Sequence, residues 1–302
     1  MSKRPGRFKN LLISAAVVAL GLAFIVHGEQ ISEAMRNFTG IPGFSKFPKI
    51  FSSVPNGKIQ VHVIDVGQAD SILIRSSDGN ILIDAGTNGS EADLKAYLDA
   101  CKVKTIDYLI CTHPHYDHIG GADMIVDKYD VGTVLMSETE VDSHVLLESN
   151  GVSFQIPELD REYTLGEISF KILSPLEKSD DENDMSLVVK LTHGDMDFLF
   201  MGDASTPTEK LLLEKYTDHE LDCEFLKVGH HGAETASSAE FLAAVTPQIA
   251  AISCEEYNDY GHPRGEVLDR LADASCETVL RTDKMGTVVV SSDGSEITVM
   301  SQ

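Results

Sequence analysis

The sequence predicts an α/β (α+β) protein in which two β-sheets pack together with helices outside, preceded by one N-terminal transmembrane helix. Three observations predict this architecture. From residue 58 onward, short apolar segments typical of strands alternate with helical segments in both halves of the chain, as expected of sheets covered by helices. The first three strand segments follow one another closely, which predicts an antiparallel meander. A long apolar segment without charges precedes them.

Residues 11–26 form this apolar segment, which has the character of a membrane helix. At about 1.5 Å per residue it is slightly short for a bilayer core, within the tolerance that flanking residues and local thinning allow. The basic residues before it should remain cytoplasmic, which places the rest of the chain outside the cell membrane. They are Lys3, Arg4, Arg7 and Lys9. The alternative is a cleaved signal peptide and a secreted protein, although no convincing small-x-small cleavage site follows.

The chain is thus expected to have three parts: a basic N-terminus with a membrane anchor (1–27), a linker rich in Pro, Gly, Phe and Ser (28–57), and one large domain (58–302). Ser90 is predicted to cap an amphipathic helix of this domain. Strands are predicted at 59–66, 70–75, 81–86, 106–111, 131–136, 168–173, 185–191, 197–201, 225–228, 249–253, 278–281 and 287–291. Further helices are predicted at 122–129, 141–149, 206–216, 238–245 and 264–274.

The strongly acidic composition restricts the partners of this protein. The formal net charge is −24, and the first 26 residues carry four basic and no acidic side chains, so residues 27–302 carry −24 − 4 = −28. Such a surface repels polyanions, so a nucleic-acid contact is disfavoured unless it is local. A small-molecule ester or a polymer ester is the expected substrate. Five scattered cysteines without a CxxC pair indicate neither a disulfide framework nor a zinc–thiolate site.

The densest group of metal-binding side chains lies in the segment 112–121, Thr-His-Pro-His-Tyr-Asp-His-Ile-Gly-Gly. It follows a predicted buried strand and precedes a predicted helix. His113 and His115 lie two apart in an extended segment and can point to one metal, whereas Asp117 and His118 can reach a second one. Imidazole and carboxylate ligands at this density predict a pair of divalent metal ions, Zn²⁺ or Mn²⁺.

The remaining ligands are expected at the ends of two later strands. Asp203 follows the apolar strand 198–201 and is predicted to bridge the metals, the alternative being a turn or capping residue. His230 and His231 follow the strand 225–228 and lie between two glycines, a position that core histidines rarely take. One of the two histidines should complete the second metal site.

Seven motifs in the same order resemble the metallo-β-lactamase superfamily, over about residues 58–300. Within it, the chain is most similar to the hydrolase domain of DNA-internalisation competence proteins (ComEC type), and more loosely to phosphorylcholine esterases. The motifs are Asp65-Val66-Gly67-Gln68-Ala69-Asp70-Ser71, Ile83-Asp84-Ala85-Gly86, Thr112 to Gly121, Asn183-Asp184-Met185-Ser186-Leu187-Val188, Gly202-Asp203, Lys227-Val228-Gly229-His230-His231-Gly232 and Tyr260-Gly261-His262-Pro263.

This resemblance implies a four-layered αββα sandwich with a dimetal site along one edge. It also implies that His231 is a metal ligand and that His230 supports the ligands or contacts substrate. The expected metal ligands are therefore His113, His115, Asp117, His118, Asp203 and His231. The expected catalytic residues are Asp117, His230 and His262.

The chain departs from the family pattern at two motifs. Ala69 replaces a glycine of the first motif, with little expected effect. Asn183 and Ser186 occupy the motif in which classical members place a histidine ligand, so Asn183 or water is expected to complete the first metal site. His193 is the only histidine nearby, and we expect it at the surface in a hairpin turn. Lactam hydrolysis by the classical route is therefore disfavoured.

The last three candidate residues are expected around the metals. Asp65 and Asp84 should orient ligands or loops. His262 precedes a proline that can open a helix, a position suited to contact with an oxyanion or phosphate; the alternative is an ordinary residue at a helix entry.

We therefore expect a membrane-anchored dimetal hydrolase that cleaves a phosphodiester through a metal-bridged hydroxide. Two metals about 3.5–4 Å apart lower the pKa of a shared water and clamp an in-line displacement. The alternatives are a lactone, thioester or other acyl hydrolase on the same fold, and a non-catalytic sensory or scaffold domain that binds metal.

Overall fold

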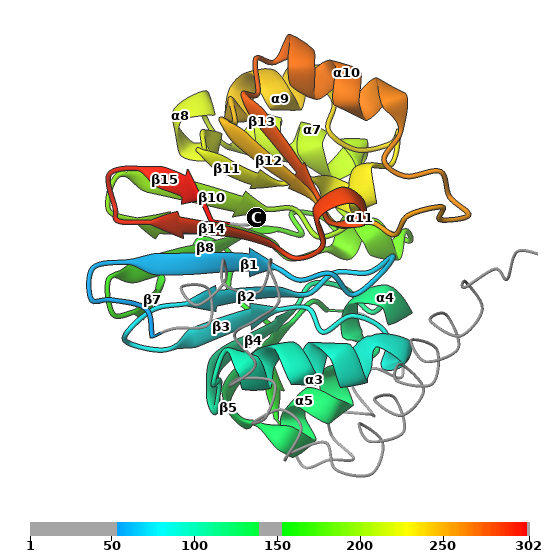
Figure 1. The fold of residues 1–302 in the computed structure, drawn as a ribbon. Helices are drawn as coiled ribbons and strands as arrows, with labels where there is room; N and C mark the ends of the chain where they lie inside the picture. Colours follow the sequence, from blue (N-terminus) through cyan, green and yellow to red (C-terminus); the bar gives the residue numbers. More distant parts are fainter. Residues whose placement is uncertain (1–52, 139–152, 301–302) are drawn as a thin grey trace, which may run out of the picture. The chain divides into compact units, whose positions relative to one another are not determined.

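A computed structural model describes residues 53–138 and 153–300 (Figure 1). The predicted membrane anchor, most of the linker and the helix predicted at 141–149 lie outside these ranges. Within them, no helix combines the length and the hydropathy of a membrane span.

The first sheet has eight strands in the order β15-β14-β1-β2-β3-β4-β5-β6. Strands β1, β2 and β3 form the predicted antiparallel meander, and β3, β4 and β5 then pair in parallel. The bounds are β1 Ile59–Val63, β2 Ile72–Arg75, β3 Asn80–Ile83, β4 Thr105–Cys111, β5 Asp130–Met136, β6 Phe154–Gln155, β14 Val288–Ser292 and β15 Ile297–Val299. Because β14 pairs with β1, the end of the chain returns to the first sheet.

The second sheet has seven strands in the order β13-β12-β11-β10-β9-β8-β7. Strands β10 to β13 pair in parallel, so their carboxyl ends lie at the same edge of the sheet. The bounds are β7 Tyr163–Leu165, β8 Ile168–Ser174, β9 Val188–His193, β10 Met196–Phe200, β11 Phe225–Lys227, β12 Ile249–Ile252 and β13 Thr278–Arg281. β9 begins three residues later than predicted because Glu182–Met185 form a short 3-10 helix, η3.

Helices cover the outer faces of both sheets, which gives the four-layered αββα order expected from the family resemblance (Figure 1). The first sheet carries α3 and α5, and the second sheet carries α7, α9 and α10. The helices are α3 Glu91–Ala100, α4 Tyr116–Ile119, α5 Ala122–Lys128, α7 Thr206–Lys215, α8 Asp218–Leu221, α9 Ala239–Val245, α10 Gly265–Asp273 and α11 Thr282–Met285, with 3-10 helices η2 Asn88–Ser90 and η4 Gly229–Gly232. Ser90 precedes α3 as predicted, but its hydroxyl bonds Thr87 rather than the first turn of α3.

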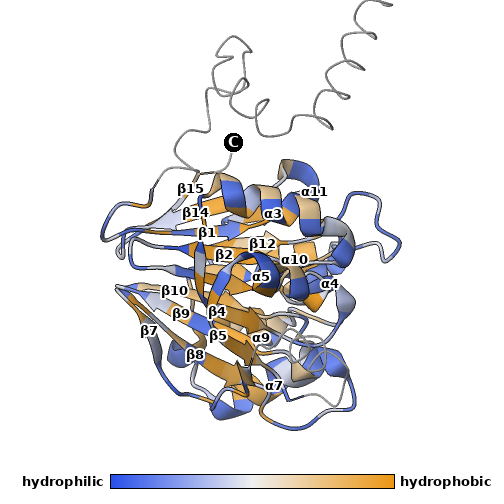
Figure 2. Cartoon of the chain, turned by 90° about the horizontal axis from the view of Figure 1, so that it is seen from below, coloured by the Kyte–Doolittle hydropathy of each residue, from blue (hydrophilic) through white to orange (hydrophobic). Residues whose placement is uncertain are grey.

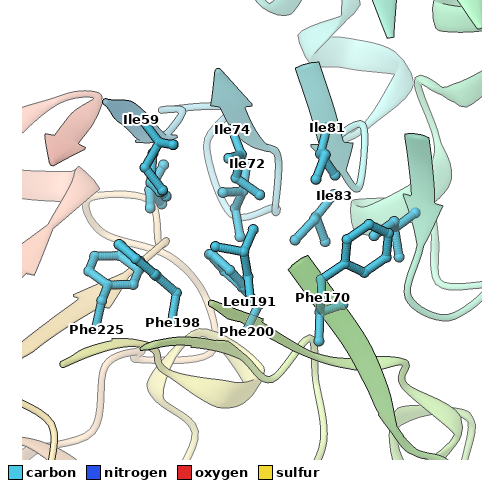
Figure 3. Close-up of a cluster of buried hydrophobic side chains, with 14 of the residues drawn as sticks. Ile59, Ile72, Ile74, Ile81, Ile83, Phe170, Leu191, Phe198, Phe200 and Phe225 are labelled. Carbon is cyan, nitrogen blue, oxygen red and sulfur yellow. The ribbon is translucent and has the colours of Figure 1, made fainter. Parts of the chain in front are cut away.

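The main core lies between the two sheets. Isoleucines on β1, β2 and β3 face phenylalanines on β8, β10 and β11 (Figure 3). The alternate residues of the same strands, such as Leu73 and Leu82, face the helices on the outside, and the strands are accordingly coloured as hydrophobic in Figure 2. Burying each of these side chains contributes about 1.5–3 kcal/mol, so the strand ends are a rigid base for the loops that follow them.

Candidate metal centre

Most of the predicted site residues come together where β4, β10 and β11 end. Three groups of side chains there have ligand atoms within 4.8 Å of one another. One of them consists of Asp70, Asp84 and His118, and the other two share Asp203. We name these two after their exposure. The buried group is Asp117, His118, Asp203 and His231, and the rim group is His113, His115 and Asp203.

His118 is held between two carboxylates. Its Nδ1 lies 2.7 Å from Oδ2 of Asp84, and its Nε2 lies 3.1 Å from Oδ1 of Asp203. When Asp84 accepts the Nδ1 hydrogen, Nε2 presents a lone pair toward the Asp203 carboxylate. A carboxylate that orients a histidine in this way is typical of metal sites, and Asp84 is therefore in the position expected of a residue that orients a ligand.

Asp84 is itself fixed by β4. The backbone N–H of Thr112 donates to Oδ1 of Asp84 at 2.8 Å, and the hydroxyl of Thr112 donates to Oδ2 at 2.7 Å. Burial raises the pKa of Asp84 despite the neighbouring His118. Asp84, Thr112 and His118 thus form one buried unit that links β3, β4 and α4.

His231 is oriented from the other sheet. Its Nδ1 lies 3.0 Å from the carbonyl oxygen of Ser253, to which it donates. Its Nε2 therefore faces Oδ2 of Asp117 at 3.4 Å and Oδ1 of Asp203 at 3.6 Å. The backbone of His231 and of the preceding His230 adopts positive φ angles, 53° and 47°. Two successive non-glycine residues in this region are strained, which is typical of functional sites.

Four buried ligand atoms at the centre make no hydrogen bond: Nε2 of His113, His118 and His231, and Oδ1 of Asp203. Leaving such atoms unpaired costs about 1–3 kcal/mol each, and in native proteins they are nearly always satisfied. A cation in the buried group would satisfy His118, His231 and Asp203, and a cation in the rim group would satisfy His113. The donor set, imidazole nitrogen and carboxylate oxygen, fits a divalent ion such as Zn²⁺ or Mn²⁺.

The pKa shifts of Asp203 and His118 also indicate that a positive charge is favourable between the ligand side chains. Burial opposes the ionised form of Asp203, but His118 and His231 outweigh burial and hold the pKa of Asp203 well below its usual range. Burial likewise opposes protonation of His118, but Asp203 and Asp84 raise its pKa well above the ordinary value. Without metal, a proton on His118 supplies the charge that a metal ion would bring.

The rim group is more open. Nε2 of His113 lies 3.8 Å from Oδ2 of Asp203. Nε2 of His115 lies 3.2 Å from Oε2 of Glu182, and both side chains are more than a third exposed. Glu182 in η3 was not predicted as a site residue, because it lies in an acidic stretch without any periodicity that would single it out.

Asn183 and Ser186 lie beside the rim group. The hydroxyl of Ser186 lies 3.4 Å from Nδ1 of His113 and accepts the backbone N–H of Asp203 at 3.0 Å. Oδ1 of Asn183 is buried and makes no hydrogen bond. Ser186 thus supports two ligands, while Asn183 has a free acceptor atom.

His230 and His262 continue the site toward solvent. Nε2 of His230 lies 3.7 Å from Oδ2 of Asp203, and its Nδ1 makes no hydrogen bond. The rings of His230 and His262 are 5.7 Å apart between centroids. Burial and the neighbouring histidines lower the pKa of His262 to about 4, so its ring is neutral at pH 7. Pro263 does not open α10 directly, because the helix begins at Gly265 after Arg264.

The structure places Asp65 outside the cluster. Its side chain is exposed and accepts the N–H of Gly67 at 3.4 Å. In the same motif it is Asp70 that is buried, and Lys227 Nζ lies 2.7 Å from its Oδ2 with both side chains almost fully buried. Oδ1 of Asp70 lies 3.6 Å from Nδ1 of His231. A lysine within an apolar strand could have signalled this pair, because buried lysines need a partner.

The expectation that His193 is exposed was wrong. His193 is buried at the end of β9, and its Nδ1 lies 3.0 Å from the hydroxyl of Ser292 on β14. The turn between β14 and β15 covers it, since Asp195 N donates to the carbonyl of Gly294 at 2.7 Å. His193 belongs to neither ligand group, so it does not replace the histidine that is missing at Asn183 and Ser186.

A comparison with protein families agrees with this geometry. The family model described as "Metallo-beta-lactamase superfamily" matches residues 64–255. The chain belongs to this superfamily of metal-dependent hydrolases. The match begins at the end of β1 and includes every residue of both ligand groups.

Named relatives include two competence proteins. ComE operon protein 3 of Bacillus subtilis is 32% identical over 255 residues, which is 76% of this chain and 32% of that protein. Competence protein ComA of Neisseria gonorrhoeae is 31% identical over 236 residues, 78% of this chain and 32% of ComA. The chain thus spans about a third of the length of these relatives.

A solved structure supports the fold. The metallo-beta-lactamase fold protein YhfI of Bacillus subtilis superposes with a TM-score of 0.54 at 13% identity, covering 78% of this chain and all of YhfI.

Proposed function

We propose that this protein is a dimetal hydrolase that cleaves a phosphodiester. The observation that carries the proposal is Asp203, whose two carboxylate oxygens face different ligand groups: Oδ1 faces His118 and His231, and Oδ2 faces His113. A carboxylate shared in this way can hold two cations side by side. The buried group would hold one ion, and the rim group, with Asn183 or Glu182 close by, would hold the other.

Metal ions bound there supply a Lewis acid and lower the pKa of water near them. The protein's own residues do the rest. Asp117 is partly exposed, and although burial opposes its ionised form, His231 and His118 lower its pKa to about 2. Its carboxylate therefore stays ionised and can orient an attacking water. His230, with its free Nδ1, and His262 can donate a hydrogen bond to a phosphoryl oxygen or to the leaving group.

The formal charges favour an anionic ester. Four buried or partly buried carboxylates and the Lys227 ammonium surround the site, which gives −4 + 1 = −3. These carboxylates belong to Asp70, Asp84, Asp117 and Asp203. Two divalent ions bring +4, so the loaded site would carry about +1, or be neutral when the nearby Glu182 carboxylate is counted, and would no longer repel a phosphate monoanion. The −28 of residues 27–302 surrounds the site, which disfavours long polyanions such as nucleic acid.

The location in the cell is part of the proposal. The basic and apolar N-terminus supports a single anchor in the cell membrane with the domain outside. Protease treatment of intact cells would then release the domain, and complete protection would contradict the outside orientation.

The function is tested on the full-length protein purified in detergent. We expect close to two Zn²⁺ or Mn²⁺ ions per chain by elemental analysis, and metal-dependent hydrolysis of bis(4-nitrophenyl) phosphate. A phosphomonoester, a lactone and a β-lactam are tested beside it under the same conditions. Faster hydrolysis of the lactone would favour the acyl hydrolase, and two bound metals without any turnover would favour a sensory or scaffold domain.

A further inference from the structure

Exposed tyrosines occur in two segments that carry residues of the metal centre. The described residues contain five large hydrophobic side chains that are exposed, and three of them are tyrosines. Tyr116 precedes the candidate ligand Asp117 in α4. Tyr257 and Tyr260 lie in the loop between β12 and α10, which also carries His262. Exposed aromatic rings next to a polar site are more typical of binding than of folding, because burying them elsewhere would stabilise the fold.

One of these tyrosines continues a row of rings that begins at the ligands. Tyr260 is 63% exposed, and its ring stacks on that of His262, with 5.6 Å between centroids and an interplanar angle of 26°. The ring of His262 meets that of His230 at 5.7 Å and 77°. His230 in turn approaches Asp203 at 3.7 Å. The row therefore leads from the carboxylate shared by both ligand groups out to solvent.

The loop that carries the row is held in place by two side chains. The side chain of Asn258 accepts the N–H of His262 at 2.9 Å and donates to the carbonyl of His262 at 2.6 Å. Gln68, from the segment between β1 and β2, accepts the N–H of Glu255 at 3.2 Å and lies 3.5 Å from Nδ1 of His262. The position of the rings is thus set before a ligand arrives, which lowers the entropy cost of binding.

The charges around the row nearly balance. The segment 255–262, Glu-Glu-Tyr-Asn-Asp-Tyr-Gly-His, contains three acidic residues and no lysine or arginine. Arg264 follows it and Lys284 lies 3.2 Å from Glu256, so the formal charge is −3 + 2 = −1. Burial and the neighbouring histidines lower the pKa of His262 to about 4, so its ring offers no positive charge at pH 7. Neutral rings stack with planar groups of many kinds, and the loop has no net positive charge that would attract a second phosphate.

We propose that His230, His262 and Tyr260 form a subsite for one neutral planar group of the substrate, attached to the phosphoryl group held at Asp203. This inference rests on the proposed function and makes it more specific. The substrate is a small phosphodiester with an aromatic or similarly flat substituent, and not a polynucleotide. Tyr260 touches the ligand by stacking, so its contribution depends on the ring and not on its hydroxyl.

The test measures binding to the metal-loaded, full-length protein by calorimetry, with phenylphosphonate and methylphosphonate as probes. Both probes carry the same anionic group, and only one carries a ring. Stacking of a planar group on an aromatic side chain favours binding, so we expect phenylphosphonate to bind about tenfold more tightly. Tyr260→Ala should weaken phenylphosphonate at least fivefold and leave methylphosphonate unchanged, whereas Tyr260→Phe should retain the preference.

Tyr257→Ala is the matched control. Tyr257 is in the same loop and is 92% exposed, but it makes no ring contact within the described part of the chain. We expect both probes to bind to this variant as to the unaltered protein. Equal binding of the two probes to the unaltered protein, or equal weakening of both by Tyr260→Ala, would overturn the inference. Tighter binding of a ten-residue oligothymidylate than of phenylphosphonate would overturn the inference that the substrate is small and not a polynucleotide.

Hydrolysis of bis(4-nitrophenyl) phosphate, followed in parallel, separates the two proposals. A ring preference without hydrolysis would contradict the proposed function while supporting the subsite. Hydrolysis without a ring preference would contradict the subsite alone.

Discussion

The two ligand groups that share Asp203 differ in depth and in number of ligands. The buried group has four residues, and three of them are almost fully buried. The rim group has three, and one of these, His115, is more than a third exposed. In the buried group each histidine is oriented through Nδ1 by a buried oxygen, that of Asp84 or that of Ser253. His115 has only the half-exposed Glu182.

Because of this difference, the two metals should not be equivalent. A ligand that is already oriented loses less freedom on binding, and a site of more ligands in a less polar surrounding holds its ion more tightly. We therefore expect the ion in the buried group to bind more tightly and the ion in the rim group to exchange with solvent.

Asp203→Ala should have the largest effect, because it removes a ligand from both groups. We expect the metal content to fall from two ions to well below one, and hydrolysis of the aryl phosphodiester to fall by about 10³-fold or more, the scale of losing a central catalytic group. Elemental analysis and steady-state kinetics measure both. Asp65→Ala is the matched control, since Asp65 is an exposed carboxylate outside the cluster. If Asp203→Ala retains two ions, the Asp203 carboxylate does not bridge the two metals.

Lys227→Met should destabilise the protein near the buried group by breaking the Asp70–Lys227 ion pair. The variant keeps the length of the side chain but leaves the Asp70 carboxylate buried without its partner. Breaking a buried ion pair in this way costs about 3–5 kcal/mol. We expect that loss in the free energy of unfolding, measured by denaturant titration without metal.

The double variant Lys227→Met, Asp70→Leu provides the control for this prediction. It removes both charges and should recover most of the stability, because no buried charge is left unpaired. It should not recover the affinity of the buried group for metal if the pair also positions His231. Full recovery of both quantities would mean that the pair acts on stability alone.

The Asp70–Lys227 pair is also an example of a contact that could not be predicted from the sequence. Twelve of the fifteen strands in the described residues, the two-sheet arrangement and the cluster that ends β4 could be predicted, because apolar periodicity and ligand spacing are local properties of the chain. The short strands β6, β7 and β15 were not predicted. Asp70 and Lys227 are 157 residues apart, and no local pattern says that they meet. The same is true of His193, whose burial depends on a turn about 100 residues later.

Within the first motif, the sequence did not distinguish Asp65 from Asp70. Both are aspartates near the end of a strand, and only the fold decides which of them faces the other sheet. Glu182 was missed for a related reason, since it lies in an acidic stretch outside any predicted element, and only the fold brings it to 3.2 Å from His115. Residues that act through tertiary contacts were therefore the ones that sequence patterns failed to find.

His115→Ala should separate the two metals. It removes one of three ligands from the rim group and none from the buried group. We expect one tightly bound ion to remain, with a loss of rim affinity of at least tenfold, measured by titrating the metal-free protein with Mn²⁺ in a calorimeter. His231→Ala, which removes a ligand from the buried group only, is the matched comparison and should weaken the tighter of the two binding events. Loss of both ions in His115→Ala would contradict the independence of the groups.

Glu182→Gln should have the smallest effect and is the most specific test of the rim group. The Glu182 carboxylate lies 3.2 Å from Nε2 of His115 and can serve as an oxygen ligand where classical members have a histidine. The substitution keeps the shape but removes the charge, so we expect the rim ion to bind about three- to tenfold more weakly, while the buried ion is unaffected. Stability should change by less than about 0.5 kcal/mol, as is usual at exposed positions. Glu177→Gln, an exposed residue of the same acidic stretch, controls for the general loss of negative charge. If both variants weaken the rim ion equally, the acidic surface attracts the ion and Glu182 is not a ligand; if only Glu182→Gln does, the site has replaced its missing histidine with a carboxylate from η3.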